Sequence, residues 1–150
     1  MAEQFFESKQ AAAILKHAVL NQYVDPFTMK TGSRSPGGRV AFVDGYAGEG
    51  RYKDGTEGSP ALLMRKAHEL SARRQLECVF VEQDNTTCET LRSVVAVEGA
   101  GLVTDVRSGD IVEHLDDVLA AKQGVPLFVF LDPFGLMPPL AEVCLSLIHI

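Results

Sequence analysis

The sequence predicts an α/β protein in which a parallel sheet is covered by helices on both faces. Short apolar runs alternate with helical patterns of about 10 to 15 residues, which is the order of repeated βαβ units. The runs are apolar at nearly every position, as expected of strands that are buried on both faces of a parallel sheet. Ligands of such sheets bind beyond the carboxyl ends of the strands, so those ends are the first place to search for function.

An amphipathic helix is predicted before the first strand. Its apolar positions recur at helical spacing, and they are Ala11, Ile14, Leu15, Ala18 and Val19. Lys9 and Lys16 are expected on the opposite side, and the helix is expected to end near Asp25 and Pro26. The stretch 31–38 is rich in Gly, Ser and Pro and is predicted to be a loop that leads into the first strand.

Four strands and three further helices follow in alternation. The strands are predicted at residues 40–43, 76–82, 102–106 and 126–131. Ser59 and Pro60 are expected to be the N-cap and the first-turn proline of the helix after the first strand. The buried positions of the three helices are expected to be Leu63, Ala67 and Leu70, then Cys88, Leu91 and Val95, then Ile111, Leu115, Val118 and Leu119.

Composition limits the class of protein. A chain of 150 residues with 46% hydrophobic content is long and apolar enough for one globular core. The start of the chain lacks a basic leader region, and no apolar stretch reaches the roughly 20 residues that span a bilayer, so a cytoplasmic protein without a membrane partner is expected. The three cysteines and four histidines lack ligand spacing, which predicts no metal site and core thiols at Cys78 and Cys88.

Positive charge is concentrated in the first half of the chain. The net charge is −6, which argues against a broadly basic nucleic-acid surface, but 11 of the 14 Lys and Arg residues lie within residues 1–75. Those near the glycine-rich segment and on the next helix are Lys30, Arg34, Arg39, Arg51, Lys53, Arg65, Lys66, Arg73 and Arg74. They could receive an anionic substrate, although an ordinary solvated surface is the simpler interpretation.

The first strand runs into an acid and a glycine-rich turn. Glycines in such a turn can adopt positive φ and let the backbone approach a ligand closely. The dinucleotide fingerprint G-x-G-x-x-G places its acid about 20 residues later, whereas here Asp44 stands directly before the first glycine. A carboxylate there would repel a pyrophosphate, but S-adenosylmethionine carries an ammonium, a sulfonium and no phosphate. The turn therefore favours S-adenosylmethionine over a dinucleotide, although taken alone it is equally compatible with an ordinary strand-to-loop turn. The predicted cofactor-binding residues are Asp44, Gly45, Tyr46, Ala47, Gly48 and Gly50.

The other strands also end at acids. Glu82 ends the second strand and is followed by Gln83. Both residues are predicted to bind the cofactor, and the Glu82 carboxylate is expected to accept hydrogen bonds from both ribose hydroxyls. Gly109 and Asp110 follow the third strand, where Asp110 is placed to accept a hydrogen bond from the adenine amino group. Taken alone, Asp110 is equally suited to cap the helix that it precedes.

The turn after the fourth strand is the candidate for catalysis. Pro133 favours an extended conformation at Asp132 and donates no backbone hydrogen bond, so the Asp132 carboxylate and a nearby carbonyl could accept from a substrate amine. Phe134 could stack on a planar group. We predict Asp132, Pro133 and Phe134 as catalytic residues, against the alternative of a strand-end turn with a buried phenylalanine.

These segments resemble the three-Cys-motif partner proteins. The resemblance rests on Phe5-Phe6, Lys9, 18–23, 44–52, Asp54-Gly55, Gly58-Ser59-Pro60, 80–82 and 132–135. It implies a Rossmann-like class I methyltransferase sheet of order 3-2-1-4 that uses S-adenosylmethionine, and a partner protein that bears a three-cysteine motif. The turn 132–135 is also similar to that of tRNA guanine-N2 methyltransferases, which suggests a nucleic-acid substrate with an amine on a base that must be extruded.

The expected organisation has three parts. Residues 1–38 form an N-terminal helix and loop, and residues 39–144 form the cofactor-binding half of a methyltransferase-like domain. A class I sheet normally continues for three more strands, so the chain is expected to be an N-terminal fragment that lacks its C-terminal strands. Residues 145–150 match a translation of a transposon end used in sequencing libraries, which suggests a non-native tail.

Three functions remain open from the sequence. A methyltransferase-like protein that methylates a base amine or a partner-associated substrate is the leading hypothesis. A non-catalytic partner module that retains the S-adenosylmethionine pocket is the alternative. An NAD-dependent oxidoreductase is a third option, against which the position of Asp44 argues.

Overall fold

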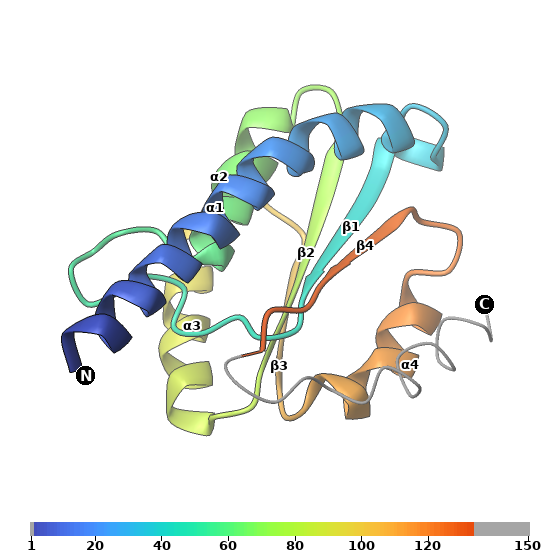
Figure 1. The fold of residues 1–150 in the computed structure, drawn as a ribbon. Helices are drawn as coiled ribbons and strands as arrows, with labels where there is room; N and C mark the ends of the chain where they lie inside the picture. The colour runs from blue at the N-terminus through green and yellow to red at the C-terminus, as the bar shows by residue number, and fades with distance from the viewer. Residues whose placement is uncertain (1, 134–150) are drawn as a thin grey trace.

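A computed structural model describes the backbone of residues 2–133 and the side chains of residues 13–133 (Figure 1). The elements are α1 (Ala2–Gly32), the 3-10 turn η1 (Pro36–Gly38), β1 (Arg39–Asp44), α2 (Ser59–Leu70), β2 (Gln75–Glu82), α3 (Asn85–Glu98), β3 (Thr104–Ser108), α4 (Ile111–Ala121) and β4 (Leu127–Phe130). Phe134, Cys144 and the suggested tail at 145–150 lie outside the described residues.

The four strands form one parallel sheet in the order β3-β2-β1-β4, which confirms the predicted α/β, Rossmann-like arrangement. Asp44 at the end of β1 is level with Phe80 of β2 and Phe130 of β4. The third strand begins two residues later than predicted. Leu102 and Val103 are apolar but precede the β3 ladder, although the Val103 carbonyl already accepts a hydrogen bond from Cys78.

Helices cover both faces of the sheet. The core on one face joins β1 and β2 to residues of α1, α2 and α3, such as Leu20, Leu63 and Leu91. The core on the other face joins Val43 and Val79 to α4. Figure 1 shows α1 and α2 together on one side of the strands and α4 on the other. The buried positions predicted for α3 and α4 are confirmed. Helix α2 buries Leu62 and Met64 in addition to Leu63 and Ala67, whereas Leu70 is only half-buried and its predicted burial is wrong.

Helix α1 differs from its prediction in length and in orientation. It continues through Pro26 to Gly32, because residues beyond the proline pack on the sheet: the Phe27 ring lies 5.5 Å from that of Phe42. Burial of this segment offsets the cost of a proline inside a helix. The inner face carries Lys16, Leu20, Val24 and Thr28, whereas Ile14 is 67% exposed. Ile14, Leu15 and Ala18 of the predicted apolar stripe therefore point outward, and Lys16 points inward.

No helix among the described residues is both long enough and apolar enough to cross a membrane. Cys78 and Cys88 are buried free thiols, as predicted, and burial raises the pKa of Cys78 to about 12.

Candidate functional site

Asp44, the acid directly before the first glycine of the turn, is fully buried, and its carboxylate accepts hydrogen bonds from within the protein. One Asp44 carboxylate oxygen, Oδ1, accepts a hydrogen bond from the Tyr46 amide at 3.3 Å, and Oδ2 accepts from the Ser59 hydroxyl. The prediction that Ser59 is the N-cap of α2 is wrong, because Gly58 occupies that position. The side chain of Ser59 instead ties the start of α2 to the end of β1.

The three glycines of the turn have two different roles. Gly48 and Gly50 adopt φ values of +72° and +88°, as expected for a turn that only glycine forms without strain. Gly45 does not have positive φ, and a Cβ there would lie 2.6 Å from the Leu131 side chain and 2.9 Å from Ile111. Gly45 is thus required for packing between β1, α4 and the end of β4. The amide of Ala47, the other small residue of the turn, donates to the Val81 carbonyl.

Glu82 is held by the backbone, and its carboxylate is only half-buried. Its Oε2 accepts from the Gly48 amide at 2.9 Å, and Oε1 accepts from the Asp84 amide at 2.9 Å. A carboxylate offers about four acceptor positions, and these contacts use two. The structure thus joins the end of β2 to the glycine turn at one carboxylate. Gln83, the next residue, is exposed.

Asp110 caps a helix. Its Oδ1 accepts a hydrogen bond from the Val112 amide at 2.9 Å, so the capping role that the sequence left open is present. Gly109 has a φ of +132° and its amide donates to the Glu82 carbonyl, which places the turn after β3 beside the end of β2. Burial raises the pKa of the nearby Tyr46 phenol, and the charge of Asp110 raises it further.

Lys16 enters the same edge of the sheet from α1. Its side chain is 8% exposed, and its ammonium lies 3.7 Å from Asp132 Oδ2, 3.5 Å from the Tyr46 carbonyl oxygen and 5.2 Å from the centre of the Phe130 ring. The Asp132 side chain is 42% exposed, and Pro133 is half-buried. Phe134, the third predicted catalytic residue, lies outside the described residues.

Two ring side chains lie near this group. The His17 and Tyr52 ring centroids are 6.4 Å apart. Burial raises the pKa of Tyr52, and the charges of Asp132, Asp44 and Asp54 raise it further. Burial also lowers the pKa of His17, and its Nε2 finds no hydrogen-bond partner among the described residues.

Sequence reasoning missed Lys16 and Ser59 at this site. The signal for Lys16 was present: extending the stripe Leu20, Val24 and Phe27 backward by one helical turn reaches position 16. That stripe continues past Pro26, and it was lost because the helix was predicted to end there.

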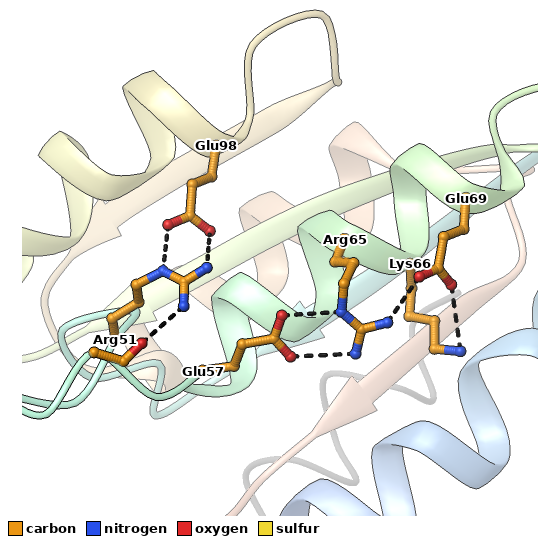
Figure 2. Close-up of polar contacts among 7 residues, drawn as sticks. Arg51, Glu57, Arg65, Lys66, Glu69 and Glu98 are labelled. Carbon is orange, nitrogen blue, oxygen red and sulfur yellow. Dashed lines mark hydrogen bonds and ion pairs between the residues drawn. The ribbon is translucent and has the colours of Figure 1, made fainter.

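Much of the positive charge near the glycine turn is paired within the molecule. Figure 2 shows Arg51 on Glu98, Arg65 between Glu57 and Glu69, and Lys66 on Glu69. Lys66 also contacts Asp25, and Arg39 contacts Glu77. These cations support loops and helices of the fold, which reduces the free positive charge that the sequence suggested for an anionic substrate.

Two other features of the molecule bear on the kind of site that it can hold. A hollow of about 450 Å³ lies beside the starts of β2 and β3, where Arg73, Arg74 and Gly101 contribute to its wall. That is the sheet edge opposite to the acids. Among the residues that the structure describes, no three His, Cys, Asp or Glu side chains come together in an arrangement that could hold a metal ion.

Comparisons with family models, curated proteins and solved structures find no match to this chain.

Proposed function

We propose that the chain is an S-adenosylmethionine-dependent methyltransferase-like protein whose cofactor lies across the carboxyl ends of the strands. The observation that carries the proposal is the pairing of Glu82 with the Gly48 amide at 2.9 Å. This contact brings a carboxylate with open acceptor positions to a turn in which the backbone is accessible. A ribose presents two neighbouring hydroxyls, and such a carboxylate can accept from both.

The start of α2 argues for this cofactor over a dinucleotide. A pyrophosphate binds at the N-terminus of the helix that follows the glycine turn. Here Ser59, Pro60 and Ala61 in the first turn of α2 are buried, Pro60 has no amide hydrogen, and the Asp44 carboxylate lies against Ser59. A negative charge beside a buried helix start disfavours a pyrophosphate, and it does not disfavour a sulfonium.

The end of β4 supplies groups for methyl transfer to an amine. When bound, S-adenosylmethionine supplies an electrophilic methyl group on a sulfonium. The Asp132 carboxylate is exposed enough to accept a hydrogen bond from an acceptor amine and to hold its lone pair toward the methyl carbon. In methyl transfer to that amine, Asp132 or water would take the proton that the nitrogen loses, and S-adenosylhomocysteine would be the leaving group. A carboxylate at this place also stabilises the charge that develops on nitrogen.

The resemblance to three-Cys-motif partner proteins extends the proposal to partners. It supports a protein bearing a three-cysteine motif as partner and an amine on a nucleic-acid base as acceptor. Lys53, in the polar loop after the glycine turn, is exposed and is a candidate to contact such an acceptor.

Calorimetric titration tests the cofactor. Titrating the purified protein with S-adenosylmethionine, S-adenosylhomocysteine and NAD should give binding of the first two and none of NAD. Binding of NAD in place of the adenosyl ligands would establish the oxidoreductase alternative.

Transfer of labelled methyl to tRNA, DNA and a partner protein tests catalysis. Asp132→Ala should reduce transfer by orders of magnitude while the affinity for S-adenosylmethionine stays within a few-fold, because Asp132 acts on the acceptor. Binding of S-adenosylmethionine without transfer to any of these acceptors would favour the non-catalytic partner module.

A further inference from the structure

We infer that Lys16 binds the carboxylate of the amino-acid part of S-adenosylmethionine. The inference rests on the proposed function and assigns a residue to the end of the ligand that the sequence left without one. It starts from an ammonium group that is buried and, among the described residues, poorly paired.

The contacts of Lys16 with the part of the chain that the structure describes leave its ammonium short of hydrogen bonds. An ammonium has three N–H groups. The Tyr46 carbonyl oxygen at 3.5 Å is beyond the usual 2.7–3.2 Å range, and Asp132 Oδ2 at 3.7 Å forms an ion pair without a hydrogen bond. A charged group that is 8% exposed is costly unless it is well paired. A second carboxylate at this position would supply the missing acceptors.

The strand order gives the direction in which the ligand lies. In the order β3-β2-β1-β4, Asp110 follows β3 and Glu82 ends β2. With adenine near Asp110 and ribose on Glu82, the rest of the ligand extends over the ends of β1 and β4. The Lys16 ammonium lies there, against Tyr46 after β1 and Asp132 after β4.

Charge at this end suits a zwitterion. The amino-acid part of S-adenosylmethionine carries one ammonium and one carboxylate. Asp132 provides a negative group and Lys16 a positive group, 3.7 Å apart and from different elements. Lys16 can therefore pair with the ligand carboxylate while Asp132 faces the incoming amine.

The test compares ligands as well as variants. S-adenosylhomocysteine carries the whole amino-acid part, its decarboxylated analogue lacks only the carboxylate, and 5′-methylthioadenosine lacks the amino-acid part. Calorimetry on the wild-type protein should show at least a tenfold loss of affinity when the carboxylate is removed. Lys16→Met should weaken S-adenosylhomocysteine at least tenfold and change 5′-methylthioadenosine less than twofold, and Lys16→Arg should restore part of the loss.

Lys30→Met is the matched control, because Lys30 is an exposed lysine of the same helix; it should leave all three affinities unchanged. An equal loss of all three ligands in Lys16→Met would make Lys16 a structural residue and overturn the inference. So would a wild-type protein that binds the acid and its decarboxylated analogue equally well, a result that needs no variant to fold. If the wild-type protein binds none of the adenosyl ligands, the proposed function fails together with the inference. If 5′-methylthioadenosine binds but the carboxylate adds nothing, the inference alone fails.

Discussion

Strand β2 carries a glutamate near each end, and the two are held in different ways. Glu77 lies near the start of the strand and is 1% exposed; Arg39 Nε and Lys122 Nζ each donate to it at 2.6 Å. Longer contacts from Arg39 Nη2 and Gln75 Nε2, both at 3.4 Å, bring the total to four. These contacts fill the acceptor positions of a carboxylate, of which there are about four.

Glu82, five residues later, is held by two backbone amides and no cation within hydrogen-bond distance among the described residues. Its acceptor positions are half used, and it lies beside a glycine turn instead of between two charged side chains. The difference separates a structural carboxylate from a candidate binding carboxylate on one strand. Saturation of the acceptor positions, more than burial or charge alone, is the property that distinguishes them.

The largest expected effect is on stability, and it follows from breaking the ion pairs of Glu77 with Arg39 and Lys122. Glu77→Gln should lower the free energy of unfolding by about 3 kcal/mol, because it leaves the Lys122 ammonium, on a side chain that is only 14% exposed, without its counter-charge. The value is at the lower end of the range for buried pairs, since the Arg39 side chain is half in solvent. Urea unfolding measures the change. Glu89→Gln, on the exposed face of α3, is the control and should change stability by less than about 0.5 kcal/mol. An equal loss in both variants would contradict the structural role of Glu77.

Acid should remove the same contribution in the wild-type protein. Burial raises the pKa of Glu77, but hydrogen bonds and charges from Arg39 and Lys122 outweigh it and hold the pKa below its ordinary value of 4.5. The stabilisation is therefore complete above pH 4.5 and is lost as the pH falls through the lower pKa of the folded state. In thermal melts between pH 6 and pH 3, the difference in midpoint temperature between the wild-type protein and Glu77→Gln should become smaller below pH 4.5. A difference in midpoint temperature that stays constant with pH would mean that the stabilisation does not depend on the ionisation of Glu77.

The two glutamates also show what the sequence could predict. The parallel sheet and the acids at the strand ends follow from local patterns: uniform apolar runs, helical stripes and the position of an acid before a glycine turn. Glu82 was found because its place at the end of a strand is a local property. Glu77 interrupts an apolar run, and its partners Arg39 and Lys122 lie 38 and 45 residues away, so no local pattern reveals them.

The predicted orientation of α1 was wrong for the same reason. Lys16 lies inside because Leu20 and Val24 of the same helix pack on the sheet, which places position 16 beside Tyr46 and Asp132. Periodicity within 11–19 assigned the opposite face to the core, and the proline at position 26 concealed the longer stripe through Val24 and Phe27. Contacts between distant segments override local periodicity where a polar residue has partners inside.

Glu82, whose carboxylate has open acceptor positions, should determine ligand affinity instead of stability. Glu82→Ala should weaken S-adenosylmethionine by about 1.5 to 3 kcal/mol, the usual contribution of hydrogen bonds to a charged group. Calorimetry measures the affinity, and Glu89→Ala is the control that removes an exposed glutamate elsewhere. Unchanged affinity in Glu82→Ala would remove Glu82 from the binding site and, with it, the contrast with Glu77.

The smallest expected effect comes from the backbone partner of Glu82. Gly48→Ala should cost about 1 kcal/mol of stability, because a Cβ meets no atom within 4 Å there and only the φ of +72° is unfavourable. Gly55→Ala is the matched control: its φ is +84°, it has the same open surroundings, and it lies in the polar loop after Arg51. Both variants should lower the thermal midpoint to a similar extent. Only Gly48→Ala should also reduce the affinity for S-adenosylmethionine, by a few-fold, because the Gly48 amide orients the Glu82 carboxylate. Equal affinities in the two variants would mean that Glu82 does not depend on the turn for its position.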